Sequence, residues 1–330
     1  MDLFIDTNVL LSFYHFTGDD LEELKKLIVL LEQKKVQLYL PSQMVSEFRR
    51  NREAKIADAL KRLKEQRLNL QFPQICKDYP EYAKLRGLLK ACESEHAALL
   101  NKLSDDSKSS ALKADAIISQ LFRLAKRVTC ADPVLQKARD RFDLGNPPGK
   151  DSSLGDAVNW EALLEAVPEK VDLHFITDDK DYRSALDDEA FNGFLSEEWL
   201  EKKKSNLIFY RRISAFFEER FPDIRLATEL EKDLLVEDLA HSSSFARTHA
   251  VIGKLSKHAD FTPAQLNAIV SAAVLNPQIK SIIDDVDVHQ FLSGVVKGRE
   301  TLVEKGSLDL LQSLMSPPKK EQAEGEDSSF

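Results

Sequence analysis

Four short apolar runs before residue 211 predict buried β-strands. They comprise residues 3–5, 36–40, 171–177 and 207–210. The first run, Leu3-Phe4-Ile5, has no polar position, so both of its faces would be buried, as in a parallel sheet. Segments with helical periodicity separate the runs, and one of them covers about 20–33. Strands that alternate with helices predict an α/β fold with a parallel sheet flanked by helices and joined by right-handed crossovers.

A helical insertion is expected between the second and third strands, over about 75–142. The pattern from 79 to 127 looks wholly helical, with a break near Ser104, and a short helix is expected over 132–142. An irregular loop rich in turn residues follows at 145–150. Two long helices placed between strands would form a cap over the sheet. After the third strand, a helix is expected to begin near Lys180.

The pattern changes at about residue 226, where the strand signal ends. We expect an α/β domain over 1–225, a helical module over 226–315 and a disordered polar tail over 316–330. Thr262-Pro263 is typical of a helix start, with threonine as the N-cap and proline in the first turn. The helices expected in the module are 229–239, 244–258, 263–275 and 286–296.

Composition restricts the class of protein and its partners. The 330 residues are 43% hydrophobic and 31% charged, which is typical of a globular protein with a sizeable core. The three cysteines, Cys76, Cys92 and Cys130, are irregularly spaced, as expected for reduced thiols in the cytoplasm rather than for a disulfide framework or a zinc site. No apolar stretch is long enough to cross a bilayer, and we expect no membrane partner. The net charge of -9 gives no general attraction to nucleic acid, so nucleic-acid binding would need a local basic patch.

One such patch is predicted on the helix that begins near Ser42. From Arg49 to Arg67 this helix has eight basic residues against three acidic ones, a local net charge of +5. Arg50 and Arg52 are the basic residues that follow Glu47 most closely after Arg49. The segment has two interpretations: a phosphate-binding ridge that leads away from Glu47, or the solvated face of a long helix. Charge alone does not decide between them.

Five acidic residues lie where the predicted elements end or begin. Asp6, Asp179 and Asp181 follow strands, whereas Glu47 and Asp156 lie in early turns of helices. The carboxyl ends of parallel strands share one edge of a sheet, so these acids can converge there. A carboxylate cluster without histidine or cysteine suits Mg²⁺ or Mn²⁺. Each acid taken alone also has a simpler interpretation, as a helix cap or a surface residue.

At these positions the chain resembles the PIN-domain nucleases. The match covers roughly residues 1 to 222 and has four motifs in order. They are Phe4-Ile5-Asp6-Thr7-Asn8-Val9-Leu10, residues 41–48 with Glu47, Gly155-Asp156-Ala157, and residues 176–182 with Asp179 and Asp181. The spacing, together with Asn-Pro-Pro-Gly-Lys before the third motif, is similar to the larger PIN-like branch of bacterial proteins with unknown or defence-related roles. The long insertion departs from the small toxin members of the family.

The resemblance implies roles for individual residues. Asp6, Glu47, Asp156 and Asp179 would hold Mg²⁺ or Mn²⁺, and Asp181 would assist a second ion. Thr7 and Asn8 would orient these ligands or the scissile phosphate, and Lys150 would contact a phosphate from its loop. Arg50 and Arg52 would bind substrate from the basic helix. The acid Asp178 is expected only to cap the following helix.

The implied activity is a metal-dependent nuclease that acts on single-stranded RNA. The main alternative is a non-catalytic PIN-like module that binds RNA or a protein. A phosphatase is disfavoured, because a second aspartate would be expected two residues after Asp6 and Asn8 stands there. The C-terminal module is a candidate surface for homo-oligomerisation or for a protein partner.

Overall fold

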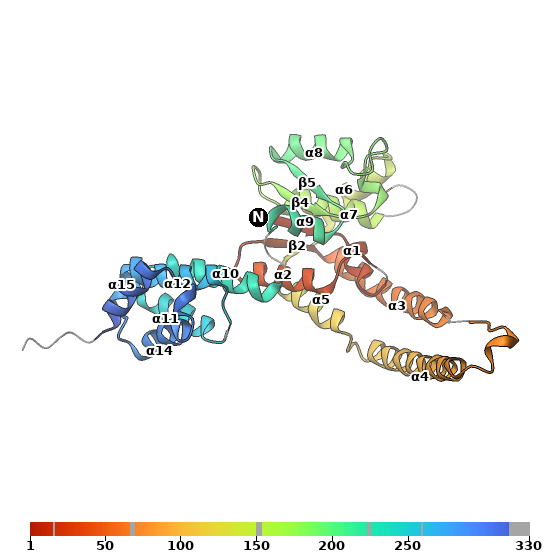
Figure 1. The fold of residues 1–330 in the computed structure, drawn as a ribbon. Coiled ribbons are helices and arrows are strands. Elements are labelled where there is room, and N and C mark those ends of the chain that lie inside the picture. The colour runs from red at the N-terminus through yellow and green to blue at the C-terminus, as the bar shows by residue number, and fades with distance from the viewer. Residues whose placement is uncertain (16, 67–69, 150–153, 223–225, 259, 317–330) are drawn as a thin grey trace, which may run out of the picture. The chain divides into compact units, whose positions relative to one another are not determined.

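A computed structural model describes residues 1–15, 17–66, 70–149, 154–222, 226–258 and 260–316. The chain divides into two compact units, of which the first is Met1–Ala227 and the second begins at Thr228 (Figure 1). Lys150 and the tail from 317 onward, for which a substrate contact and disorder were expected, lie outside the described residues. No helix among the described residues is long and apolar enough to cross a membrane.

The first unit is built on a five-stranded, all-parallel sheet. Its strand order is β3-β2-β1-β4-β5, with β1 at the centre. Pairing of Ile5 with Ile176 aligns the carboxyl ends of β1 and β4. The strands are β1 (Asp2–Ile5), β2 (Gln37–Pro41), β3 (Lys126–Val128), β4 (Leu173–Ile176) and β5 (Leu207–Tyr210). The chain moves outward from β1 through β2 to β3 and then returns to β4. The ends of β1 and β4 therefore flank the point where the strand order reverses, which is where open α/β sheets bind ligands.

The reversal of strand order distributes the helices over both faces of the sheet (Figure 1). One group packs around α2, which contacts α5 and α9, and the other packs around α7, which contacts α3, α6 and α8. The helices of this unit are α1 (Thr7–Ser12), α2 (Leu21–Glu32), α3 (Ser42–Glu65), α4 (Pro80–Lys108), α5 (Lys113–Leu124), α6 (Asp132–Asp143), α7 (Leu154–Ala166), α8 (Gly193–Lys203) and α9 (Ile213–Arg220). The α/β fold with a parallel sheet is as expected.

The insertion differs from its prediction in two ways. Residues 79–127 are not wholly helical, because α4 ends at Lys108 and β3 forms an edge strand beside β2. Two of the three β3 residues are cations and only Val128 is buried, so its sequence lacks the apolar run of a central strand. The insertion also does not form the single cap over the sheet that was expected. Helices α5 and α6 pack in the two helix layers, whereas α4 runs along α3.

The segment after β4 also differs from the prediction. The helix expected near Lys180 is a single 3₁₀ turn, Lys180–Tyr182, and α8 begins only at Gly193. The Asp179 side chain caps this turn by accepting the Asp181 N–H at 3.0 Å. An antiparallel bridge between Arg183 and Phe191 then closes the loop that leads to α8. The backbone pairing between residues 183 and 191 is therefore incompatible with the continuous helix predicted from about Lys180.

The second unit is helical throughout its described residues. Its helices are α10 (Ala227–Ala240), α11 (Phe245–Leu255), α12 (Pro263–Leu275), α13 (Pro277–Ser281), α14 (Val286–Val296) and α15 (Lys305–Met315), with a 3₁₀ turn at Glu300–Leu302. They enclose their own apolar core, which includes Leu239, Ile252 and Leu292. Thr262 caps α12 in a reciprocal capping box with Gln265. Helices α13 and α15 were not predicted, and α11 ends before its expected limit of residue 258.

Candidate functional site

The carboxyl ends of β1 and β4 hold Asp6 and Asp179 beside each other. The Asp6 N–H donates to Ile176 O at 2.9 Å, which continues the β1–β4 pairing by one residue. The Thr177 hydroxyl donates to Asp6 Oδ2 at 2.8 Å and accepts the Asp179 N–H at 3.0 Å. One buried threonine thus links both acids, although the sequence pattern gave it no role.

Both carboxylate oxygens of Asp179 are oriented by hydrogen bonds. Asn8 Nδ2 donates to Oδ2 at 3.0 Å, and the Asp181 N–H donates to Oδ1. Asn8 lies in α1, directly after β1, so the first motif positions the acid of the fourth motif. If Asp179 is a metal ligand, this hydrogen bond would let Asn8 orient it, which stays a prediction.

Four acids share one electrostatic environment around Asp6. Only 2% of Asp6 is exposed. Burial, together with the carboxylates of Asp156, Asp179 and Glu47, raises its pKa from 3.8 to about 8, against the Thr177 hydrogen bond that lowers it. Without a bound cation, Asp6 is therefore largely protonated at neutral pH. The four carboxyl groups expected to be ligands are therefore near enough to influence one another electrostatically.

Glu47 reaches this space because helix α7 packs closely on α3. A Cβ on Gly155 would lie 2.8 Å from Gln43 Nε2 and 3.8 Å from Glu47 Oε2. The glycine therefore permits the close approach that brings Asp156, the next residue, toward Glu47. Burial raises the pKa of Glu47 and Asp179 adds to the rise, whereas Thr7 and the Arg50 guanidinium lower it. Arg50 is thus a cation of the basic helix that favours the charged form of Glu47.

Three buried polar side chains in or beside these motifs have atoms that make no hydrogen bond of ordinary geometry among the described residues. The atoms are Thr7 Oγ1, both amide atoms of Asn159, and Arg183 Nε. Thr7 follows Asp6, and Asn159 lies one helical turn after Asp156. Such groups are costly to bury without a partner, such as water, an ion or a ligand. The sequence indicated Thr7 but not Asn159, which occurs in an otherwise apolar stretch.

Tyr182 is a third residue to which the sequence pattern gave no role, after Thr177 and Asn159. It is 1% exposed, and its hydroxyl donates to the Asp156 backbone oxygen at 3.4 Å. Burial raises its pKa, and the charges of Asp156, Asp6, Asp179 and Glu47 raise it further. The phenol therefore remains neutral beside the acids. The sequence feature that could have indicated Tyr182 is its position at the end of the fourth motif.

Other predicted site residues lie in different surroundings. Arg52 donates from Nε and Nη2 to the two oxygens of Asp115, each at 2.6 Å, in an ion pair between α3 and α5. This pair holds α5 against α3 and occupies the Arg52 guanidinium. Asp181 is half-buried and has polar contacts beyond its N–H bond to Asp179. Asp178 is exposed and pairs with Arg211 at 2.9 Å, so it does not belong to the cluster.

A family model described as PIN domain matches residues 3–182. The match covers more than half of the chain and includes all four motifs. The chain belongs to the PIN-domain family. No curated protein and no solved structure matches it significantly. PIN domains have a nuclease-type fold, bind nucleic acid and generally use divalent metals.

The donor chemistry of this PIN domain fits a hard divalent cation. Its four converging side chains are all carboxylates, and they raise the pKa of Asp6 by mutual repulsion. A bound cation would relieve that repulsion and would favour the ionised form of Asp6. Among the described residues, however, no three His, Cys, Asp or Glu side chains already form a preassembled metal-binding group. The residues that would hold the ion are Asp6, Glu47, Asp156 and Asp179.

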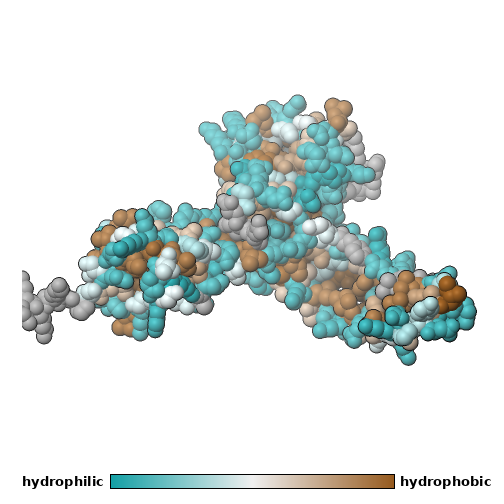
Figure 2. Space-filling view, viewed as in Figure 1, coloured by the Kyte–Doolittle hydropathy of each residue, from teal (hydrophilic) through white to brown (hydrophobic). Residues whose placement is uncertain are grey.

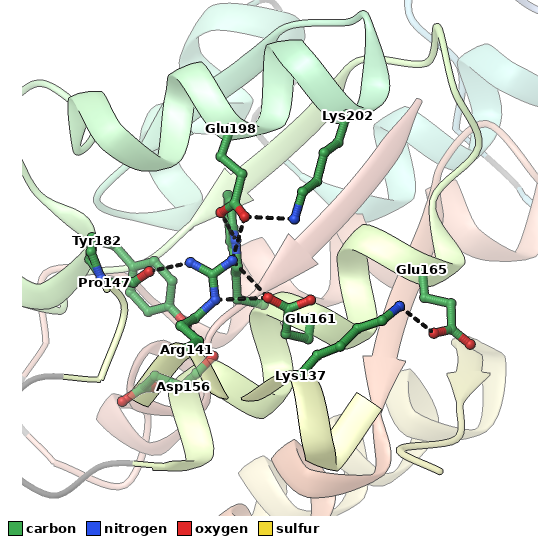
Figure 3. A network of polar contacts seen from close by, with 10 residues as sticks. Lys137, Arg141, Pro147, Asp156, Glu161, Glu165, Tyr182, Glu198 and Lys202 are labelled. Atoms are coloured by element: carbon green, nitrogen blue, oxygen red, sulfur yellow. Dashed lines mark hydrogen bonds and ion pairs between the residues drawn. The ribbon is translucent and has the colours of Figure 1, made fainter. Parts of the chain in front are cut away.

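A second buried charge network of the PIN domain supports the helix that carries Asp156 (Figure 3). Arg141 in α6 donates to Glu161 of α7 at 2.8 Å and to Pro147 O at 2.6 Å, and it also pairs with Glu198 of α8. Lys202 donates to the same Glu198 at 2.7 Å. The network ties α7 to α6, to α8 and to the loop before the third motif. Arg141 is thus a positioning residue for the N-terminal turn of α7.

Proposed function

We propose that this PIN-domain protein is a metal-dependent nuclease that hydrolyses phosphodiester bonds in single-stranded RNA. The observation that carries the proposal is the buried carboxyl of Asp6, whose pKa is raised to about 8 by burial and by three other acids. A protein that keeps mutually repelling acids in one buried space incurs a cost in stability, and perturbed acids of this kind cluster at functional sites.

The proposed roles follow the positions of the side chains. Asp6, Glu47, Asp156 and Asp179 hold Mg²⁺ or Mn²⁺, and Asp181 assists a second ion. The bound ion supplies a Lewis acid that activates water and stabilises the leaving oxygen. Thr177 and Asn8 orient Asp6 and Asp179 through hydrogen bonds of 2.8 and 3.0 Å. The buried Thr7 hydroxyl lies beside Glu47, whose pKa it lowers, and would contact a ligand or the scissile phosphate.

The exposed cations of α3 provide the proposed path for the RNA backbone. Arg49, Arg50 and Lys55 are exposed, whereas Arg52 is committed to Asp115. Changing Arg50 and Lys55 to Ala should weaken RNA binding and reduce the salt dependence of the affinity. For a single strand the log-log slope is about -0.7 for each phosphate contacted. Lys137 and Arg139, exposed on α6, provide the matched control pair. An unchanged slope would identify the α3 cations as a solvated face.

The decisive experiment is a cleavage assay on labelled single-stranded RNA, single-stranded DNA and a tRNA pool with Mn²⁺. Asp6→Asn should abolish cleavage, and Asp178→Asn should retain it, because Asp178 lies outside the cluster. Cleavage of DNA alone would overturn the choice of RNA. If wild type binds RNA without cleaving it, the non-catalytic module becomes the better conclusion.

A further inference from the structure

The carboxyl end of β5 forms a pocket beside the acid site. The pocket has a volume of about 440 Å³, within the range of about 300–1,000 Å³ that is typical of ligand sites. Its walls include four charged side chains, which are Asp178, Glu189, Arg211 and Arg212. The arm that α3 and α4 form has hydrophobic atoms at its surface instead (Figure 2). The chemistry of the β5 pocket therefore suits a charged ligand.

Hydrogen bonds connect this pocket to the proposed metal ligands. The Thr177 N–H donates to Tyr210 O at 3.0 Å, while the Thr177 hydroxyl donates to Asp6 Oδ2 at 2.8 Å. Asp178, which lines the pocket, directly precedes Asp179. Neighbouring strands of a sheet lie about 4.8 Å apart. The pocket is thus one strand away from the acids, at the same edge of the sheet.

Arg211 is held in the wall of the pocket by two exposed carboxylates. Its Nε donates to Asp178 at 2.9 Å, and its Nη1 donates to Glu189 at 2.6 Å. One acid follows β4 and the other belongs to the loop before α8, so the arginine joins both segments to the end of β5. Because two carboxylates balance this guanidinium, Arg211 positions the wall and is not the main attraction for an anion.

Arg212 is a cation of the same pocket that has no partner. Its side chain is exposed and makes no hydrogen bond or ion pair with the residues that the structure describes. A Cβ on Gly18 would lie 3.2 Å from Arg212 Nη1, so the glycine leaves room for the guanidinium. Asp19 accepts the Ile213 N–H at 3.0 Å and the Ser214 N–H at 3.3 Å, which fixes the backbone that follows Arg212. The end of β5 therefore presents a guanidinium with free donors in a defined place.

The strand order places Arg212 across the acids from the cations of α3. Helix α3 follows β2, and the order β2-β1-β4-β5 puts the acids after β1 and β4 between α3 and the end of β5. A guanidinium binds phosphate oxygens through charge-assisted hydrogen bonds. A single strand that lies on the α3 cations and crosses the acids would next reach the β5 pocket.

We propose that Arg212 binds a backbone phosphate of the RNA strand, on the side of the scissile bond opposite α3. This inference rests on the proposed nuclease function, because it places the strand across the acids. The RNA backbone is then held on both sides of the acids, by the α3 cations on one side and by Arg212 on the other.

The first test measures binding of labelled single-stranded RNA by fluorescence anisotropy over a range of KCl concentrations. All proteins carry Asp6→Asn, so that the RNA stays intact. Arg212→Ala should reduce the salt slope by about 0.7, so its loss of affinity should be about 2.6-fold larger at about 50 mM than at about 200 mM KCl. Arg212→Lys should keep the slope, because the charge is kept. Arg139→Ala, at an exposed cation of α6, is the matched control and should not change it.

A structural role of Arg212 would give a different result. The side chain is exposed and unpaired, so thermal melting of Arg212→Ala should match its parent. A salt slope that Arg212→Ala leaves unchanged, or a reduction that Arg139→Ala reproduces, overturns the proposal.

The second test locates the contacted phosphate. It uses a short RNA that wild type cleaves at one bond in Mn²⁺, prepared with a neutral methylphosphonate at one linkage at a time. The linkage at which Arg212→Ala no longer weakens binding marks the phosphate that Arg212 contacts, and Arg50→Ala marks the α3 side in the same way. The two linkages should lie on opposite sides of the scissile bond. Linkages on the same side, or none that silences Arg212→Ala, overturn the proposal.

Failure of this inference can be told apart from failure of the proposed function. A wild type that cleaves no RNA in Mn²⁺ would refute the nuclease, and with it the side of the scissile bond, whereas the salt slope would still decide whether Arg212 binds RNA. A wild type that cleaves RNA, with an Arg212→Ala variant that binds it as tightly and with the same salt slope, would refute the Arg212 contact alone.

Discussion

Helix α7 connects two clusters of buried acids that differ in how their charge is balanced. Its first turn places Asp156 among acids that, with burial, raise the pKa of Asp6 to about 8. Further along, Glu161 receives a hydrogen bond from the buried Arg141 (Figure 3). Burial alone would raise the pKa of Glu198 in this second cluster, but hydrogen bonds from Arg141, Lys202 and Trp160 lower it.

The acids of the Arg141 network stabilise the fold, whereas the acids around Asp6 destabilise it. In the Arg141 network a guanidinium faces two carboxylates, and its hydrogen bond helps to lower the pKa of Glu198. Around Asp6 the neighbouring carboxylates oppose ionisation, and folding without a cation leaves that acid protonated. The same helix is therefore stabilised at one cluster and destabilised at the other.

The largest expected effect comes from removing the cation of the balanced cluster. Arg141→Met should lower the free energy of unfolding by about 3–5 kcal/mol, because Glu161 and Glu198 would remain buried without Arg141. Urea denaturation of the first unit measures the loss. Lys137→Met is the control, since its 3.7 Å pair with Glu165 is exposed and should contribute less than about 1 kcal/mol. Equal, small losses in both variants would remove the distinction between the clusters.

The opposite sign is expected at Asp6. Asp6→Asn replaces an acid that folding leaves protonated with a neutral amide of nearly the same shape, so it should raise the free energy of unfolding in EDTA at neutral pH by roughly 1–3 kcal/mol. The rise in melting temperature on adding Mn²⁺ should shrink in this variant. At free metal near one hundred times the dissociation constant, wild type should gain about 2.7 kcal/mol. An unchanged Mn²⁺ response in Asp6→Asn would show that this acid does not bind the metal.

The stability gained by Asp6→Asn in EDTA should depend on pH. Because the pKa of Asp6 is raised from 3.8 to about 8 on folding, its contribution to stability is present below 3.8 and lost as pH rises toward 8. In EDTA, Asp6→Asn and wild type should therefore differ little near pH 4 and most near pH 8. Thermal melts at both pH values measure this difference. A constant offset between the two proteins would exclude repulsion among the acids as its cause.

The smallest effect is expected at the tyrosine between the motifs. Tyr182→Phe removes a hydroxyl whose hydrogen bond to Asp156 O is long, at 3.4 Å, so the loss of stability should be at most about 1 kcal/mol. The buried ring remains and keeps its contact with Phe175. Urea denaturation in EDTA checks the value. A loss as large as that of Arg141→Met would give the hydroxyl a structural role that its geometry does not indicate.

Much of the fold and the acids of the site could be predicted from local sequence. Each central strand is a short apolar run, and Asp6 and Asp179 follow β1 and β4 directly, so their edge of the sheet was predictable. Strand β3 was not, since an edge strand with one buried residue has no apolar run. The basic residues of α3 also looked alike in sequence, yet Arg52 pairs with Asp115 while Arg50 lies near Glu47.

By itself, the sequence determined the parallel α/β sheet, its PIN-domain motifs and the acids at the strand ends, because these depend on patterns within one element. Only the tertiary structure decided which charges are balanced. Thr177 contacts Asp6 across 171 residues of chain, Arg52 contacts Asp115 across 63, and Arg141 contacts Glu198 across 57. Such contacts depend on how helices and strands pack, and periodicity within one segment carries no information about the residue that will face it from another.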